Sequence, residues 1–294
     1  MNDSQPIRPH LVSRVWGGER LRALLRDAAT SDATAGPIGE AWFGTARGDA
    51  THALVKLLDV AGALSVQVHP DDAQALRLAG PTGVGKHEAW VVLEAAPGAS
   101  VLLGMADGAT LDDLLCGEPG RVEAALAVRP GAVGDVIDVS PGTVHAPGAG
   151  LLLYEIQQRS DLTYRIWDWG RPRALHLEAS RHCLRPDAHG IVGRLPDGSA
   201  GPTRLSEAGA PFRLEHLRVD GSAEGIGLAL ERAVVLSVIE GSLQLHGLAA
   251  ASVAHPCTAG HGLVLGGGQV ALQCGLGAHK AFVVGLLALR VLFP

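Results

Sequence analysis

Turn-forming residues are spread along the whole chain. The 294 residues include 39 glycines and 17 prolines, and these fall at intervals and not in one tract. Between them lie short runs rich in valine, leucine and isoleucine, which are typical of β-strands bounded by turns. The pattern therefore predicts many short strands rather than disorder.

Size and charge narrow the class of protein. With 47% hydrophobic residues, the chain can bury a large core, and its length suggests about two domains. The net charge is −6, and the sequence contains no basic patch, so we expect no nucleic-acid partner. No apolar run is suited to spanning a membrane, and the first residues lack the pattern of a signal peptide. The four cysteines form no C-x-x-C pair, which favours reduced thiols and a cytoplasmic location.

The pattern divides the chain into two β modules. Residues 186–211 are rich in proline, glycine and serine, and are the best linker candidate. We therefore expect a first module over 1–185 and a second, all-β module over 212–294. Helical spacing interrupts the first module at 19–29, 71–79 and 110–128, where the last stretch predicts two short helices around Pro119. The clearest strands are expected at 87–95, 100–105, 135–139 and 151–158.

Polar side chains lie on several apolar strands of the first module. In LSVQVHPDD (64–72), Gln67 and His69 are two residues apart, so they face the same side of a strand. Glu88 is the second residue of the run HEAWVVLEA (87–95), at the start of an apolar strand, and His145 follows the turn of SPGTVHA. One such histidine alone is more often a satisfied core residue, but four unpaired polar groups would be costly to bury. Two imidazoles, a carboxylate and an amide oxygen suit Zn²⁺, with a position left for water or substrate.

The chain resembles a known family at an ordered set of blocks. Residues 64–72 and 141–146 resemble the two metal-binding motifs of cupins. Over residues 10–175 the chain is similar to the short bacterial form of the type I mannose-6-phosphate isomerases, and 206–294 resembles that family's metal-free jelly roll in pattern. The resemblance implies an all-β fold with helical insertions and two cupin-type jelly-roll modules. The matching blocks are VWGGERL (15–21), GEAW (39–42), LVKLLDVAGALSVQVHPDD (54–72), GKHEAW (85–90), PGTVHA (141–146) and EIQQRSDLTYRIWDWGR (155–171).

The resemblance implies a zinc-dependent aldose–ketose isomerase. The reaction interconverts mannose 6-phosphate and fructose 6-phosphate by moving a proton between C1 and C2 through an enediol, with one Zn²⁺ per chain as the Lewis acid. Lys86, two residues before Glu88, would share its face of the strand and serve as base or proton shuttle. Arg165 would face the negative charge that develops on the substrate oxygen. Asp161 could hold Arg165 in place by a charge-assisted hydrogen bond. The implied metal ligands are Gln67, His69, Glu88 and His145, and the implied catalytic residues are Arg165 and Lys86.

Several roles stay open at the level of the sequence. The second acid or base could be a metal-bound water, His87 or Glu155. The family usually has threonine at the position of His87 and serine at that of Arg159, and the added cation of Arg159 could alter phosphate recognition.

The oligomeric state is not predicted. Two rival functions are a non-catalytic bicupin that binds a sugar and an isomerase acting on an unphosphorylated sugar. The candidates for holding the phosphate are Arg159, Arg171, Arg173 and Lys56, while His246, His255, His261 and His279 are interpreted as surface or core residues.

Overall fold

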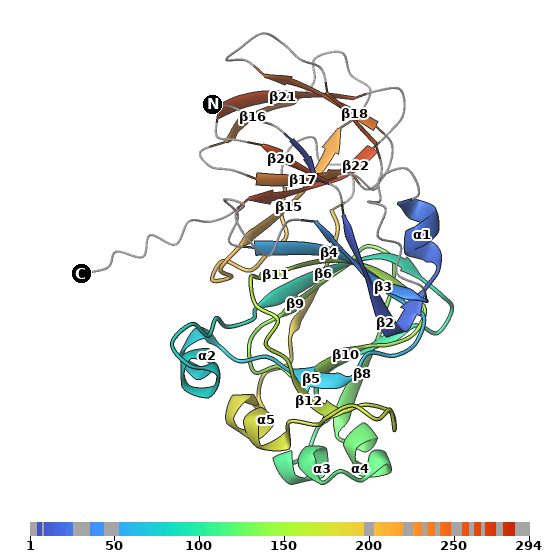
Figure 1. Ribbon diagram of the computed structural model, residues 1–294, viewed down its shortest axis with the longest axis vertical. Coiled ribbons are helices and arrows are strands. Elements are labelled where there is room, and N and C mark those ends of the chain that lie inside the picture. Colours follow the sequence, from blue (N-terminus) through green and yellow to red (C-terminus); the bar gives the residue numbers. More distant parts are fainter. Residues whose placement is uncertain are drawn as a thin grey trace, which may run out of the picture.

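The protein consists almost entirely of antiparallel sheets. The computed structural model describes residues 5–7, 9–25, 36–43, 53–196, 203–219, 226–230, 234–238, 242–247, 255–258, 262–265, 268–274 and 279–285. These residues form four sheets, gathered in two stacked bodies with the late strands in one and most of the earlier strands in the other (Figure 1). Short helices are inserted between strands of the body that holds most of the earlier strands. The predicted all-β fold with helical insertions is therefore confirmed. None of the helices among the described residues has the length and apolar character needed to cross a membrane.

Two facing sheets build the body that carries the candidate site. The larger has the order β13-β9-β6-β11-β4-β3-β2 and the smaller the order β12-β5-β10-β7-β8. The strands of the larger sheet are β2 (His10–Gly18), β3 (Ile38–Phe43), β4 (Ala53–Val60), β6 (Glu88–Ala95), β9 (Asp135–Val139), β11 (Leu151–Gln158) and β13 (Ile191–Arg194). Those of the smaller sheet are β5 (Val66–Val68), β7 (Ser100–Met105), β8 (Leu126–Pro130), β10 (His145–Pro147) and β12 (Tyr164–Trp167).

Alternation along the strands separates two cores. On β11, Leu151 and Leu153 face the smaller sheet and pack in a buried cluster with Trp90 and Leu103. The residues between them, such as Leu152, point to the opposite face of the larger sheet and join a second cluster. The period of two in the sequence therefore decides which side chains face the space between the sheets, where the site lies.

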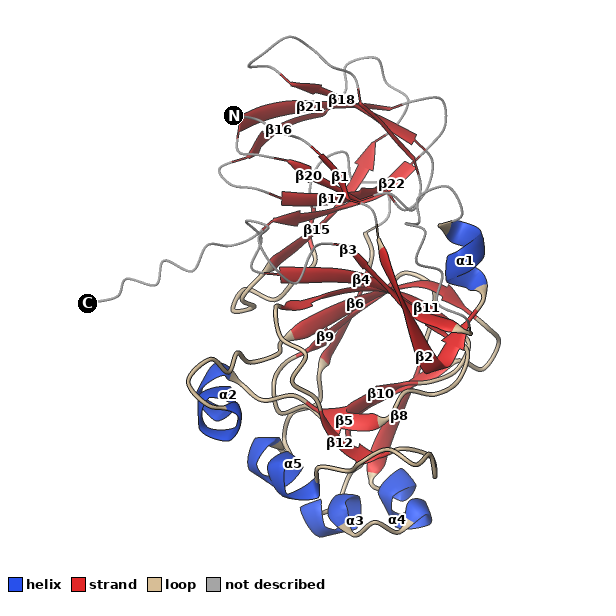
Figure 2. Cartoon of the chain, viewed as in Figure 1, coloured by secondary structure: helices blue, strands red, loops and turns tan. Residues whose placement is uncertain are grey.

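The helices lie mainly against the outside of the smaller sheet. They are α1 (Arg20–Leu24), α2 (Asp72–Ala79), α3 (Leu111–Leu115), α4 (Pro119–Ala124) and α5 (Leu177–Cys183). Figure 2 shows α3, α4 and α5 at the end of the molecule beyond β8 and β12, where Leu114, Val122 and Cys183 join a buried cluster with Val68. The helix expected at 71–79 is α2, which Asp71 caps in a reciprocal capping box with Gln74. Helix α5 was not predicted.

The second body pairs two further sheets. The six-stranded sheet has the order β1-β20-β17-β22-β15-β14, and the four-stranded sheet has the order β16-β21-β18-β19. Their strands are β1 (Gln5–Ile7), β14 (Thr203–Arg204), β15 (Arg213–Val219), β16 (Ile226–Leu230), β17 (Val234–Val238), β18 (Ser242–Gly247), β19 (His255–Thr258), β20 (Gly262–Leu265), β21 (Gly268–Cys274) and β22 (His279–Gly285).

Sheet pairing crosses the sequence boundaries expected for the modules. Strand β1, at the start of the chain, pairs with β20, and β13, inside the expected linker, pairs with β9. The two bodies meet where Phe212 and Leu214 pack against Tyr154 and its neighbours on the outer face of the larger sheet. The Tyr154 hydroxyl also lies 3.0 Å from the Ser237 hydroxyl. The division at 185 and 212 stays a prediction.

Candidate metal centre

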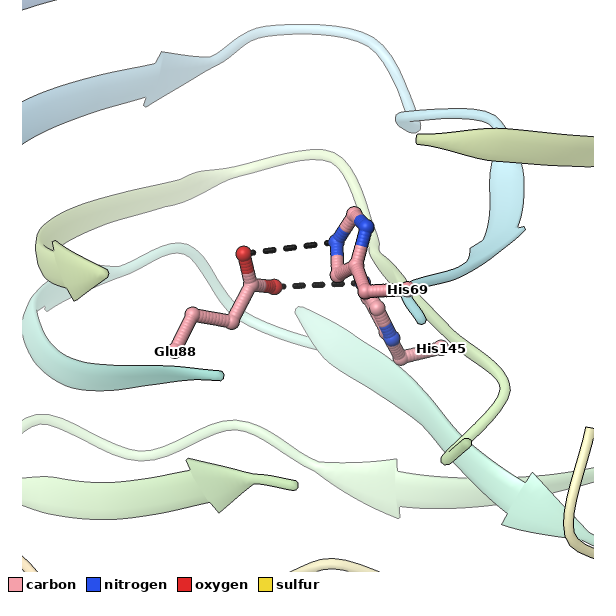
Figure 3. Close-up of side chains that lie close together, drawn as sticks. All are labelled: His69, Glu88 and His145. Atoms are coloured by element: carbon pink, nitrogen blue, oxygen red, sulfur yellow. Dashed lines mark ion pairs between the residues drawn. The ribbon is translucent and has the colours of Figure 1, made fainter. Parts of the chain in front are cut away.

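Three buried side chains from different strands converge between the facing sheets. His69 directly follows β5, Glu88 opens β6 and His145 opens β10. One donor atom from each lies within 4.8 Å of the others, and each residue is at most 1% exposed. The carboxylate of Glu88 points at both imidazoles (Figure 3), with 3.1 Å from its Oε1 to Nε2 of His145 and 3.4 Å from its Oε2 to Nε2 of His69.

Local sequence explains how these side chains meet. Strand β5 ends at Val68, and Pro70, two residues further on, cannot donate to a neighbouring strand. The turn before His145 then docks on this end, because the N–H of Gly142 donates to the carbonyl of His69 at 2.9 Å. Gly142 has φ +90°, and a Cβ there would lie 2.7 Å from the side chain of Arg185. Glycine is therefore required at the turn that places His145.

Both histidines are anchored by their outer ring nitrogens. Nδ1 of His69 lies 2.9 Å from the carbonyl of Leu162, and Nδ1 of His145 lies 2.9 Å from the carbonyl of Thr143. A carbonyl only accepts, so each Nδ1 carries the proton and each Nε2 turns a lone pair toward Glu88. Burial and the nearby ammonium of Lys86 lower the pKa of His69 to about 3, which keeps that ring neutral.

The converging donor set suits a cation. Within the described residues, neither oxygen of Glu88 has a well-aligned hydrogen bond, although both are buried. Two imidazole lone pairs and a carboxylate repel one another, and the ammonium of Lys86 offsets this only from the edge of the cluster. Nδ1 anchoring of this kind is also what fixes the rings of metal-ligating histidines. The residues therefore fit a divalent ion such as Zn²⁺.

Lys86 lies at the edge of this cluster. Its Nζ is 2.8 Å from Oε2 of Glu88 and 3.2 Å from Nε2 of His69. Lys86 thus shares the side of Glu88, as the spacing in the sequence predicts. Burial favours a lower pKa for Lys86, but attraction by Glu88 and Glu155 outweighs it and raises that pKa. In the same way, the Lys86 charge holds the pKa of Glu88 well below its usual range against the effect of burial.

Gln67 reaches the cluster with its amide nitrogen. Its Nε2 is 3.2 Å from Nε2 of His145, and its Oε1 accepts from the hydroxyl of Ser65 at 3.2 Å. Half a turn of the amide would direct the oxygen at the cluster and let the nitrogen donate to Ser65. Gln67, the predicted fourth ligand, therefore lies within reach of the cluster. Its amide would have to turn over before its oxygen could bind a metal ion.

Arg165 is placed by strand register. It lies opposite Gln67, which in turn lies opposite His145, so the three form one row across β12, β5 and β10. Its Nη1 donates to the carbonyl of Ala174 at 2.9 Å, and no acceptor among the described residues bonds its buried Nε. Burial and the charge of Arg173 lower the pKa of Arg165. The described contacts include none between Arg165 and Asp161, so the expected pairing of these two residues is wrong in this structure.

A polar row on the inner face of the larger sheet continues the site. Nζ of Lys56 is 3.1 Å from Oε1 of Glu155 and 2.5 Å from Oε1 of Gln157. The indole N–H of Trp90 donates to Oε2 of Glu155 at 3.1 Å. Gln157 lies opposite Glu88 in the sheet. The sequence offered Lys56 only as a candidate for holding the phosphate and did not single out Gln157, although alternation along LLLYEIQQ puts Gln157 on the face of Glu155.

Other sequence candidates lie elsewhere or are already paired. His87 points to the outer face of the larger sheet, with its Nε2 2.8 Å from Oδ1 of Asp138. As a neighbour of Glu88 on a strand it faces the opposite side, so it does not join the cluster. Arg171 and Arg173 both pair with the buried carboxylate of Asp168. The side chains of His246, His255, His261 and His279 lie outside the described residues.

The two facing sheets, with a buried His/Glu/His cluster that could hold a metal ion and a second all-β unit beside them, define a protein of the cupin-type fold. No protein-family model matches the chain. A mannose-6-phosphate isomerase of Streptococcus mutans is 32% identical over 212 residues, which cover 59% of this chain and 65% of that enzyme, a little under two thirds of its length. A probable mannose-6-phosphate isomerase of Bacillus subtilis is 32% identical over 216 residues, or 60% of this chain and 67% of the relative. The chain belongs to the mannose-6-phosphate isomerase family.

Solved structures of the same family share the fold. The crystal structure of mannose 6-phosphate isomerase from Bacillus subtilis superposes with a TM-score of 0.77 at 23% identity, covering 96% of this chain and 99% of that one. A mannose 6-phosphate isomerase bound with zinc and yttrium superposes with a TM-score of 0.70 at 13% identity, covering 97% of this chain and 100% of that one. At such identities the likeness supports the architecture alone, and it confirms the expected cupin-type fold.

Proposed function

We propose that the protein is a zinc-dependent isomerase that interconverts mannose 6-phosphate and fructose 6-phosphate. The observation that carries the proposal is the convergence of His69, Glu88 and His145, with Lys86 in contact and Arg165 in the adjoining row. Relatives named mannose-6-phosphate isomerase support the choice of substrate. Ligation would come from His69, His145 and Glu88, with Gln67 as a fourth donor after its amide turns.

The chain's own residues would divide the work of an enediol proton transfer. A bound zinc ion would supply Lewis-acid stabilisation of negative charge on a sugar oxygen. Lys86 would take the proton from C2 of the aldose and return it at C1, because a nearby dication disfavours its ammonium form. Arg165 would orient the open chain and stabilise charge that develops on oxygen. Glu155, held by Trp90, is a candidate for moving the hydroxyl proton.

Two rival functions differ from this proposal in what they require. A sugar-binding protein without activity has no need of a lysine in contact with the donor set or of a polar row beyond it. An isomerase of unphosphorylated sugars needs the same centre but no phosphate site. Comparing kcat/KM for mannose 6-phosphate and for mannose separates the proposal from the second rival.

Chelation tests the proposal as a whole. The purified protein is assayed for mannose 6-phosphate conversion in a coupled assay for fructose 6-phosphate, before and after EDTA treatment and after Zn²⁺ is restored. We expect activity to disappear on chelation and to return with about one equivalent of Zn²⁺ per chain. Circular dichroism of the chelated sample controls for unfolding. Full activity in a sample shown to contain no metal would rule out the zinc centre.

A further inference from the structure

His176 occupies the N-cap position of helix α5, but its side chain does not cap the helix. Ser, Thr, Asp and Asn are the usual N-cap residues, because their short side chains accept from the first free N–H groups of the helix. His176 occupies the N-cap position, and its side chain makes no hydrogen bond to its own helix. Its half-buried imidazole lies instead beside β12, where Nδ1 accepts from the backbone N–H of Arg165 at 3.0 Å.

His176 pairs with both backbone groups of Arg165. Its own N–H donates to the Arg165 carbonyl at 2.7 Å, which completes a reciprocal pair. Strand β12 is at the edge of its sheet, so these groups would otherwise face outward without a neighbouring strand. A single residue, using one backbone and one side-chain nitrogen, therefore takes the place of a neighbouring strand at Arg165.

This pairing fixes the side of the strand on which Arg165 acts. Because its N–H and carbonyl both turn toward His176, Arg165 and Gln67 form a pair without direct backbone hydrogen bonds, the kind whose side chains lie closest together. The register shifts between Arg165 and Trp167, so pairing to β5 is irregular directly after Arg165. Two residues before His176, the carbonyl of Ala174 accepts from Nη1 of Arg165 at 2.9 Å. Residues 174–176 thus hold both the backbone and the guanidinium of Arg165.

We propose that His176 is a positioning residue that holds Arg165 at the centre through an unprotonated Nδ1. This inference rests on the proposed function, in which Arg165 acts on the transition state. It requires a neutral ring with its proton on Nε2, because a protonated Nδ1 would confront the Arg165 N–H. Burial and the charge of Arg165 both lower the pKa of His176, in agreement with a neutral ring.

Two amide variants separate this role from simple packing. In His176→Asn the side-chain oxygen falls close to the place of Nδ1, whereas in His176→Gln the acceptor falls near Nε2. We expect His176→Asn to keep kcat within about threefold. We expect His176→Gln and His176→Phe to lose about 10- to 100-fold in kcat, because small displacements of a catalytic group are costly. Zinc content is measured on every sample and should be unchanged. Equal losses in the Asn and Gln variants would overturn the inference.

A double-mutant cycle tests whether His176 acts through Arg165. In the Arg165→Ala background, His176→Phe should change kcat by less than about twofold, because the group that it positions is gone. A further loss as large as in the wild-type background would make the role of His176 independent of Arg165 and overturn the inference.

The tautomer gives a readout that does not depend on activity. Nitrogen-15 NMR of the zinc-loaded wild-type protein at neutral pH should show Nδ1 of His176 unprotonated and Nε2 protonated, and the opposite tautomer would overturn the inference. An inactive wild-type enzyme would instead overturn the proposed function. Equal activity of the Asn and Gln variants in an active enzyme would overturn only the role of His176.

Discussion

His87 and Glu88 are neighbours at the start of β6, yet they face two different regions of the molecule. Glu88 points between the sheets, where it meets two imidazoles and an ammonium. His87 points outward, where it pairs with Asp138 and packs its ring edge-on against Phe212 at 5.4 Å between centroids. The inner face of the larger sheet gathers buried charge, and the outer face builds the apolar contact between the two bodies. Residues at the start of one strand can therefore serve both the site and the stability of the fold, because alternation directs their side chains to opposite faces of the sheet.

The largest effect should come from removing an inner-face imidazole. We expect His145→Ala to lose its zinc and at least about 10³-fold of its activity, since one remaining imidazole, a carboxylate and an amide bind zinc weakly. His87→Ala is the matched control on the outer face and should keep its zinc. Metal content by elemental analysis and kcat are measured on the same samples. A His145→Ala protein that keeps its full zinc content would contradict the assignment of the inner face as the metal site.

Substitution of Arg165 should lower kcat without changing the zinc content. Arg165→Ala should keep zinc and fold but lose about 10²–10³-fold in kcat, because it removes a contact made mainly in the transition state. Arg165→Lys should restore little, since the planar fork is lost. Kinetics for mannose 6-phosphate are paired with zinc determination. If only KM rises, Arg165 contributes uniform binding, and if zinc is lost, its role is structural.

Substitutions on the outer face of the larger sheet should lower the free energy of unfolding without changing zinc content or kcat. Phe212 is fully buried between the two bodies, so Phe212→Ala should lower the free energy of unfolding by about 3–5 kcal/mol. At temperatures where the variant stays folded, zinc content and kcat should match the wild type. Denaturant unfolding gives the first quantity and the coupled assay the second. Val128→Ala, at a side chain 62% exposed, is the control and should change little.

The smallest effect should come from the hydroxyl that joins the two bodies. Tyr154→Phe removes the contact with Ser237 and should cost about 1 kcal/mol of stability. It should leave kcat unchanged, because Tyr154 lies on the face opposite Glu155. A clear fall in kcat at normal stability would show that the two faces of the sheet communicate.

Period-two alternation explains most of what the sequence could predict of the site. It puts Gln67 beside His69 and Lys86 beside Glu88, and the structure brings all four together with His145. The same rule separates His87 from the cluster, so its inclusion among the acid–base candidates was wrong on grounds already present in the chain.

What could not be predicted depends on contacts distant in sequence. Nothing local indicates that β1 would pair with β20, or that Arg165 would turn its guanidinium to Ala174 and not to Asp161. Helix α5 begins at a histidine, which carries no ordinary start signal. Such features follow from which strand edges remain free after the sheets form.

We propose that His69, Glu88 and His145 hold one catalytic zinc ion, with Gln67 turned to join them. Anomalous diffraction at the zinc edge, on crystals of enzyme shown to be active, tests it most directly. We predict one zinc peak per chain, within about 2.0–2.2 Å of Nε2 of both histidines and of a Glu88 oxygen. Active crystals with no zinc at this position, or with zinc only among the strands that follow residue 212, would contradict the account.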